Sequence, residues 1–153
     1  MATIAAHIIA SIKASGVKRL YGLPGDSVNG LTDALRRDGE VDWVHVRHEE
    51  SAWLAAAAKA GLAGELAVCV GRCGPGNPNL INGLSGAQRS RVPVLAIAAQ
   101  IPGAEIGSGY FQETRPQPAG ELFRGCSVHA EVADTAESAP RILELAMRAA
   151  VER

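Results

Sequence analysis

Short apolar segments alternate with helical segments along the whole chain, and this alternation restricts the fold more than any other feature of the sequence. Apolar residues recur at helical spacing between segments that glycine and proline separate. The pattern predicts strands over residues 17–22, 41–46, 67–70, 93–98 and 127–132. Helices are predicted over residues 3–15, 28–38, 52–60, around 80–84 and over 140–151. Strands and helices that alternate at such short spacing indicate a doubly wound, mainly parallel α/β sheet flanked by helices.

The size and composition of the chain are those of one globular domain. It has 153 residues, of which 47% are hydrophobic and 20% charged, and its formal net charge is -1. A chain of this length buries one substantial core but not two. Because the charge is balanced, no broad basic surface is available for a phosphate backbone, and we expect no nucleic-acid partner.

The cysteines indicate a reducing compartment. Cys69, Cys73 and Cys126 form neither a paired framework nor, with the histidines, a four-ligand zinc pattern, so we expect reduced thiols and no metal site. The first residues lack the basic start and apolar run of a signal peptide, and no stretch is long and apolar enough to span a bilayer. We therefore expect a cytoplasmic protein without a membrane segment.

Three glycine-rich or charged turns follow predicted strands, at residues 22–27, 47–50 and 71–77. In parallel sheets of this kind, ligands bind at the carboxyl ends of the strands. The third turn, GRCGPGN, follows a strand and opens a helix, so its amides can receive an anion or let a planar ligand approach; a tight structural turn explains the same residues equally well. Neither G-x-G-x-x-G nor a P-loop is present. Residues 101–117 form a long loop, which is typical of functional or disordered segments.

Ser27 lies in a near match to a nucleophile elbow. In residues 25–30, GDSVNG, the second glycine comes one residue too late for G-x-S-x-G. Asp26 or Ser27 is instead expected to cap the helix that follows. A small α/β hydrolase that uses Ser27 is the corresponding alternative.

Glu49 is the carboxylate with the most suggestive position. It lies where a predicted strand gives way to an alanine-rich, buried helix, so apolar surroundings are expected to raise its pKa and allow proton exchange near neutrality. Glu50 is expected to point to solvent and to complement the helix dipole. Taken alone, either glutamate fits a solvated role. The next histidine comes at the wrong spacing for H-E-x-x-H, which excludes a zinc-protease helix.

Several motifs in order give the chain a family resemblance. Residues 21–27 (YGLPGDS), 47–50 (RHEE), 73–77 (CGPGN) and 80–84 (LINGL) together resemble the amino-terminal pyrimidine-binding domain of thiamine-diphosphate-dependent enzymes. Residues 92–99 (VPVLAIAA) and 105–114 (EIGSGYFQET) most resemble the pyruvate:quinone oxidoreductases (ubiquinone-dependent pyruvate dehydrogenases) and pyruvate oxidases of that family, and more loosely the acetolactate synthases. The resemblance covers essentially the whole chain.

The resemblance implies a role for each matching residue. Glu49 would hydrogen-bond N1' of the cofactor's aminopyrimidine and act as the catalytic residue, placing the proton that activates the cofactor. The implied cofactor-binding residues are Pro24, Gly25, Gly74, Pro75, Gly76, Asn77, Phe111 and Gln112. For Phe111 and Gln112, which would face the reaction centre and flavin, a loop anchor and a solvated polar residue are the alternatives.

The resemblance also implies partners. The Gly-Asp-Gly motif of the family's diphosphate- and magnesium-binding domain does not occur, and the FAD-type middle domain is absent, so residues 1–153 would form a single pyrimidine-binding domain. Magnesium and FAD then belong to the complete enzyme. We expect a homo-oligomer, or a complex with a diphosphate-binding domain or subunit, and little activity from the chain alone. The alternative is a non-catalytic remnant or regulatory module that pairs with a full-length homologue. Residues 118–120 resemble an insertion beside the 111–112 loop.

Overall fold

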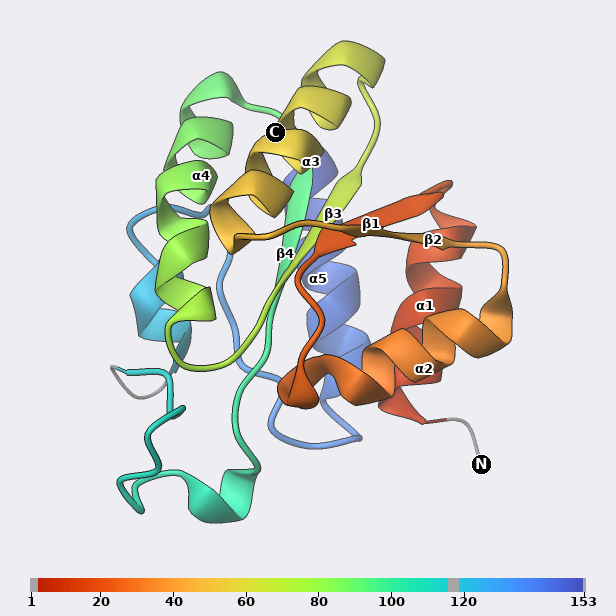
Figure 1. Cartoon of the computed structure of the whole chain (residues 1–153). Helices are drawn as coiled ribbons and strands as arrows, with labels where there is room; N and C mark the ends of the chain where they lie inside the picture. Colours follow the sequence, from red (N-terminus) through yellow and green to blue (C-terminus); the bar gives the residue numbers. More distant parts are fainter. Residues whose placement is uncertain (1–2, 116–118, 153) are drawn as a thin grey trace.

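A four-stranded parallel sheet lies between two layers of helices in the computed structural model, which describes residues 3–115 and 119–152 (Figure 1). The strands are β1 (Arg19–Gly22), β2 (Asp42–His45), β3 (Ala67–Gly71) and β4 (Val94–Ala98). Their order is β2-β1-β3-β4, and each neighbouring pair is parallel. The helices are α1 (Ile4–Ala14), α2 (Asn29–Asp38), α3 (Glu49–Ala63), α4 (Gly76–Ser90) and α5 (Ala139–Val151). The predicted doubly wound α/β class is confirmed.

Each face of the sheet has its own apolar core. Helices α1, α2 and α5 cover one face, where Val68 and Val70 of β3 belong to the buried cluster. Helices α3 and α4 cover the other face, where Ala67 and Cys69 of the same strand are buried. All five residues of β3 are buried, because successive side chains of a strand point to opposite faces and both faces are covered.

The predicted helix ends are confirmed at two places. Thr3 caps α1, and its side-chain Oγ1 accepts a hydrogen bond from the Ala6 amide at 3.1 Å. Helix α2 ends at Asp38, and Gly39 follows it in the left-handed conformation with φ 70°, which favours glycine. Ser27 is not a cap: it lies in the short 3-10 helix η1 (Asp26–Val28), and neither η1 nor α2 has a side-chain cap. Its hydroxyl contacts a different turn, described below.

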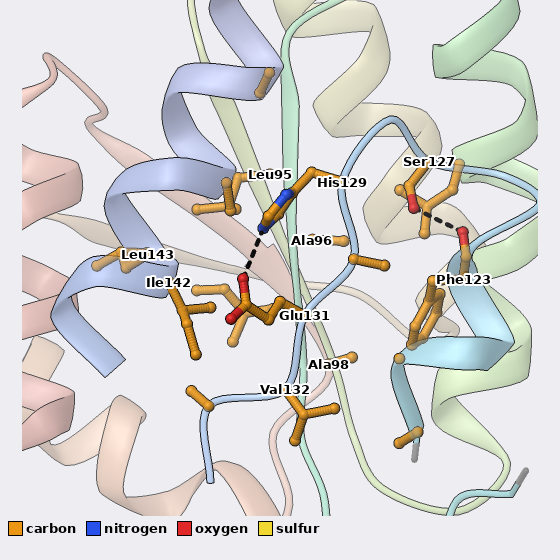
Figure 2. Close-up of a pocket in the computed structure, with 18 of the residues that line it drawn as sticks. Leu95, Ala96, Ala98, Phe123, Ser127, His129, Glu131, Val132, Ile142 and Leu143 are labelled. Atoms are coloured by element: carbon orange, nitrogen blue, oxygen red, sulfur yellow. Dashed lines mark hydrogen bonds and ion pairs between the residues drawn. The ribbon is translucent and has the colours of Figure 1, made fainter. Parts of the chain in front are cut away.

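The strand predicted over residues 127–132 is wrong. This segment has no strand pairing and passes β4 as irregular chain, with a cavity of about 420 Å³ between it, β4 and α5 (Figure 2). Val128 and Val132 are exposed, so the alternating pattern does not bury an apolar face. A polar contact with α5 holds the segment instead: Glu131, which lies 3.6 Å from Nε2 of His129, pairs with Arg141 of α5 at 2.5 Å.

The long loop predicted over residues 101–117 contains no strand in its described part and includes the 3-10 helix η2 (Gly103–Glu105). A further 3-10 helix, η3 (Ala119–Phe123), follows it. Of the predicted insertion, residue 118 lies outside the described residues. Within the described residues, the helices are too short or too polar to cross a membrane.

Candidate functional site

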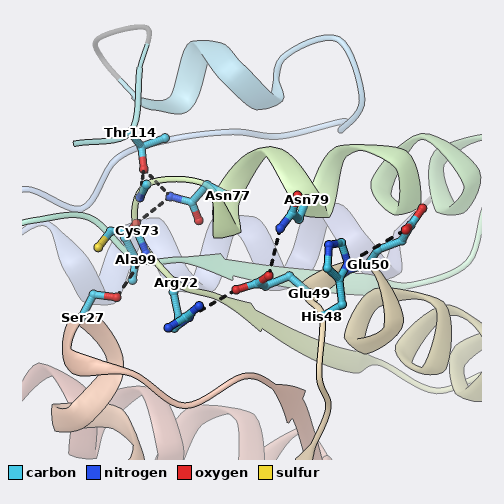
Figure 3. A network of polar contacts seen from close by, with 11 residues as sticks. Ser27, His48, Glu49, Glu50, Arg72, Cys73, Asn77, Asn79, Ala99 and Thr114 are labelled. Carbon is cyan, nitrogen blue, oxygen red and sulfur yellow. Dashed lines mark hydrogen bonds and ion pairs between the residues drawn. The ribbon is translucent and has the colours of Figure 1, made fainter. Parts of the chain in front are cut away.

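The turns that follow β1, β2 and β3 meet at the carboxyl edge of the sheet (Figure 3). Oγ of Ser27, from the first turn, accepts a hydrogen bond from the amide of Cys73 in the third at 3.1 Å. Arg72, also in the third turn, reaches Glu49 at the start of α3. The edge where the sequence places a ligand site is therefore an assembled cluster of three segments, and the Ser27 hydroxyl is engaged in holding two of them together.

Glu49 is a buried charge at a helix start. It is the first residue of α3 and is 2% exposed, while His48 caps the helix through its Nδ1, which accepts from the Glu50 amide at 3.3 Å. Oε1 of Glu49 lies 3.4 Å from Nε of Arg72, and Oε2 accepts a hydrogen bond from Nδ2 of Asn79 at 3.1 Å. The helix dipole adds to the stabilisation of this carboxylate. The expected apolar surroundings are not found at the carboxyl group itself, because both of its oxygens face polar donors.

Two glycines allow the backbone to approach this pair closely. A Cβ atom on Gly76 would lie 2.6 Å from Oε1 of Glu49, and one on Gly25 would lie 2.4 Å from Cδ of Arg72. Both distances are shorter than any packed side chain allows, so larger residues would displace either the carboxylate or the arginine. Gly25 and Gly76 therefore both lie against the side chain of Arg72, and we call the space that this side chain fills beside Glu49 the hollow. A buried carboxyl group at this position can share a proton with a ring nitrogen of an aminopyrimidine.

A second set of contacts fixes the turn to the loop beyond β4. Gly74 has φ +65°, and its amide donates to Oγ1 of Thr114 at 3.1 Å. Nδ2 of Asn77 donates to the same hydroxyl and to the carbonyl of Ala99, both at 2.7 Å. A Cβ on Gly74 would lie 3.1 Å from Cα of Gln112. Gly74 and Asn77 thus have a structural role in the turn, and their predicted contact with a cofactor stays a prediction.

The remaining predicted residues lie at the surface. Pro24 and Pro75 are exposed, and Gln112 is half-buried. Phe111 is 82% exposed, with its ring centroid 5.2 Å from that of Tyr110. The structure therefore gathers Glu49, Gly25 and Gly76 around one hollow but leaves Phe111 on the outside of its loop.

Three contact residues escape the sequence reading: Arg72, Asn79 and Thr114. Of the three, only Arg72 could have been predicted as a site residue from the sequence, since it is a charged residue inside a glycine-rich turn at the carboxyl end of a strand. Asn79 lies three residues after Gly76 in the first turn of α4, and Thr114 lies within the long loop. In the described part of the chain, no group of three or more histidine, cysteine or acidic side chains is arranged to hold a metal ion.

Comparison with known proteins assigns the chain to a family. Residues 2–119 match the family described as "Thiamine pyrophosphate enzyme, N-terminal TPP binding domain", and the chain belongs to it. This membership confirms the resemblance and supports thiamine diphosphate as the cofactor.

Three relatives illustrate the range of proteins that share this domain. An uncharacterized 42.6 kDa protein in the isoamylase 3' region of Pseudomonas amyloderamosa is 60% identical over 97% of the chain. Pyruvate oxidase of Lactiplantibacillus plantarum is 38% identical over 95%, and acetolactate synthase isozyme 2 large subunit of Escherichia coli is 35% identical over 89%. The chain spans 37% of the length of the first and 24% of the other two.

Proposed function

We propose that the chain supplies the pyrimidine half of a thiamine diphosphate site, with Glu49 as the residue that exchanges a proton with the ring. The observation that carries this proposal is the 2% exposed carboxylate of Glu49 at the carboxyl edge of the sheet, beside the hollow of Gly25 and Gly76. Thiamine diphosphate, when bound, supplies the electron sink for decarboxylation of a 2-oxo acid. Glu49 contributes proton placement at the ring nitrogen, and the two glycines let the ring approach the backbone.

The surrounding residues orient this carboxylate. Asn79 donates to Oε2 at 3.1 Å, which leaves Oε1 as the oxygen that can face a ring. The His48 cap fixes the start of α3 and therefore the position of Glu49. Both contacts reduce the motion of a group that must meet its partner within hydrogen-bond distance.

For the complete protein we propose the oxidative decarboxylation of pyruvate, with flavin and a quinone as acceptors. The match to a pyruvate oxidase supports pyruvate, whereas the match to acetolactate synthase allows a carboligation on the same 2-oxo acid. Magnesium and the diphosphate would be held by another domain or subunit, and the site would be completed in an oligomer. Three free, buried cysteines support the cytoplasm as the compartment.

The proposal is tested by complementation. The chain is mixed with a diphosphate-binding partner chain from a relative, together with pyruvate, thiamine diphosphate and magnesium, and carbon dioxide release is measured. We expect activity from the mixture and a loss of at least about 100-fold with Glu49→Gln, the usual contribution of a positioned acid or base. Glu50→Gln, one residue along, is the matched control and should retain activity. Full activity of Glu49→Gln would refute the role of Glu49.

A non-catalytic module that pairs with a full-length homologue is the second candidate function. Large apolar side chains at the surface favour it: Leu62 is 91% exposed, Phe111 82% and Leu54 55%. A partner that covers them would bury apolar area without requiring chemistry. Tight binding to the homologue without thiamine diphosphate binding, measured by calorimetry, would support this function over the first.

A further inference from the structure

We infer that Arg72 is a competing internal ligand of Glu49, so that a ring can bind the Glu49 carboxylate only when the guanidinium of Arg72 is displaced. The inference rests on the proposed function and identifies the residue that controls affinity and selectivity at that site. The contact between the two side chains spans 23 positions of the sequence and joins two separate turns.

The side chain of Arg72 fills the hollow described above. Its Cδ and Nη1 atoms would lie 2.4 and 3.1 Å from a Cβ on Gly25, and its Cβ would lie 3.2 Å from a Cβ on Gly76. The arginine stem is thus packed against both glycines that give access to the carboxylate. A planar ring that reaches Oε1 of Glu49 through this space cannot share it with the stem.

The same oxygen is already in use. Nε of Arg72 lies 3.4 Å from Oε1, while Asn79 binds the other oxygen, Oε2. A ring nitrogen that binds Oε1 must therefore replace Arg72 and not Asn79. The remaining Asn79 contact keeps one oxygen partnered throughout the exchange.

Exposure shows that the exchange is feasible. The side chain of Arg72 is 39% exposed, whereas that of Glu49 is 3% exposed. Arg72 can rotate into water without leaving a buried charge of its own, and a half-exposed guanidinium loses little free energy on leaving a single long contact. Glu49 cannot move out, because it is the first residue of α3 and lies behind Gly76. The arginine is thus the mobile partner and the glutamate the fixed one.

This arrangement selects among ligands. To replace the guanidinium, a ring nitrogen must share a proton with Oε1, brought either by the protonated ring or by a protonated Glu49. A ring that cannot share a proton would leave Glu49 buried without its partner. Anionic groups would bind the freed Arg72 rather than the carboxylate. The hollow therefore admits flat heterocycles whose ring nitrogen is basic enough to hold a proton against Glu49, as in the aminopyrimidine class, and excludes rings of the same size without a basic nitrogen.

The experiment follows the arginine directly by NMR. The 15N-labelled chain is titrated with 4-amino-5-hydroxymethyl-2-methylpyrimidine, and the side-chain Nε–Hε signal of Arg72 is assigned by its loss in Arg72→Lys. We expect this signal to move toward its position in Glu49→Gln as the ring binds. In Arg72→Ala, the dissociation constant of the ring should fall about fivefold, the factor expected for an ion pair of this exposure.

Control variants separate the effect of the Arg72–Glu49 ion pair on affinity from the effects of net charge and of side-chain bulk. Arg148→Ala removes one positive charge from α5, where Arg148 pairs with Glu144, and should leave the dissociation constant unchanged. In the Glu49→Gln background, Arg72→Ala should change the affinity less than in the native background, because the ionic competition no longer exists and only the steric contribution of the stem remains. Arg72→Met, which keeps the bulk of the stem without the charge, separates the steric contribution from the ionic one.

Each outcome supports or overturns the inference. Glu49-dependent ring binding that leaves the Arg72 signal unmoved, or that is no tighter in Arg72→Ala, overturns the inference and leaves the proposed function standing. If the ring binds neither the native chain nor Arg72→Ala at millimolar concentration, both the inference and the pyrimidine site are wrong. Whether the Arg72 signal moves on ring binding is measured on the native chain alone, so an unstable variant does not prevent the test.

Discussion

Two buried side chains, those of Thr114 and Asn77, connect the turn after β3 to the loop after β4. Both are at most 2% exposed, so the polar atoms they join are cut off from water. A hydroxyl that accepts two hydrogen bonds at such a position is costly to remove, because its donors keep their desolvation penalty. The geometry around Gly74 therefore depends on one distant threonine.

We predict that Thr114→Val lowers the free energy of unfolding by about 2 kcal/mol, the cost of leaving a buried donor unsatisfied at constant side-chain shape. Urea denaturation measures the change. Thr32→Val is the control: its hydroxyl donates to the carbonyl of Asn29 within α2, and the change should be within about 0.5 kcal/mol. Equal effects of the two substitutions would contradict the role assigned to Thr114.

A second prediction concerns Cys69 in the middle of β3. Burial raises the pKa of its thiol from 9.0 to about 12. Above pH 9 the unfolded chain loses this proton while the native chain keeps it, so the free energy of unfolding falls as the pH rises, by up to about 1.4 kcal/mol per pH unit. The stability contributed by the neutral thiol is therefore complete below pH 9 and lost toward pH 12.

The measurement compares urea unfolding of the native chain and of Cys69→Ala between about pH 8 and pH 10.5. Lysine and tyrosine titrations are common to both proteins and cancel in the difference. The native chain should lose stability more steeply with rising pH than the alanine variant. Parallel pH profiles would show that the thiol is accessible to water in the native state.

At the residue scale, the sequence predicts where a residue lies within a helix or strand better than which side chains it contacts. The place of Glu49 at a helix start is predictable, because a strand signal ends just before an alanine-rich run. Its partners are not, since Arg72 and Asn79 are 23 and 30 positions away and reach it only after three turns converge. Ser27 shows the same limit: local pattern favours a helix cap, whereas tertiary contact with Cys73 decides.

Among the elements, α3 and α4 pack so closely that the α4 position facing Trp53 has no room for a side chain. The indole of Trp53 on α3 lies against Gly83 on α4, where an added Cβ would be 2.0 Å from the ring. Alanines at positions 52, 56 and 60 complete the buried face of α3. Small residues on one helix thus accommodate the single large residue of the other.

We therefore predict opposite effects for two glycine substitutions. Gly83→Ala should destabilise the fold by about 2 kcal/mol, because overpacking against Trp53 outweighs the gain in helix propensity. Gly30→Ala in α2, where an added Cβ meets nothing within 4 Å, should stabilise it by about 0.5 kcal/mol. Thermal unfolding followed by circular dichroism gives both values. A stable Gly83→Ala variant would mean that the two helices are free to separate.

The segment at residues 127–132 shows where element prediction fails. Its alternation of apolar and polar residues is typical of a strand, but a strand also needs a neighbouring strand to pair with, and the periodicity of one segment does not identify that neighbour. Here Glu131, a polar residue of the pattern, pairs with Arg141 of α5 and lies beside His129. The four strands that do form are those whose apolar residues contact helices on the sheet faces.

For the whole molecule, the rule that ligand sites lie at the carboxyl ends of parallel strands correctly brings the three turns together. The strand order β2-β1-β3-β4 is not contained in that rule, because alternation of strands and helices permits several orders. This order places β3 in the interior of the sheet and β4 at an edge, beside the cavity. The free energy of local opening should therefore be higher for β3 than for the strands at the edges of the sheet.

Hydrogen exchange of the native chain tests this distribution. Amides of Val68 and Val70 in β3, which is paired on both sides and fully buried, should exchange only through global unfolding. Amides of β2 should exchange through a smaller opening, since β2 pairs only with β1 and has no fully buried residue. The amides of residues 128–132 should exchange fastest of the three groups, because no strand pairing protects them. Protection of residues 128–132 equal to that of β3 would mean that this segment joins the sheet in solution, as its sequence pattern indicates.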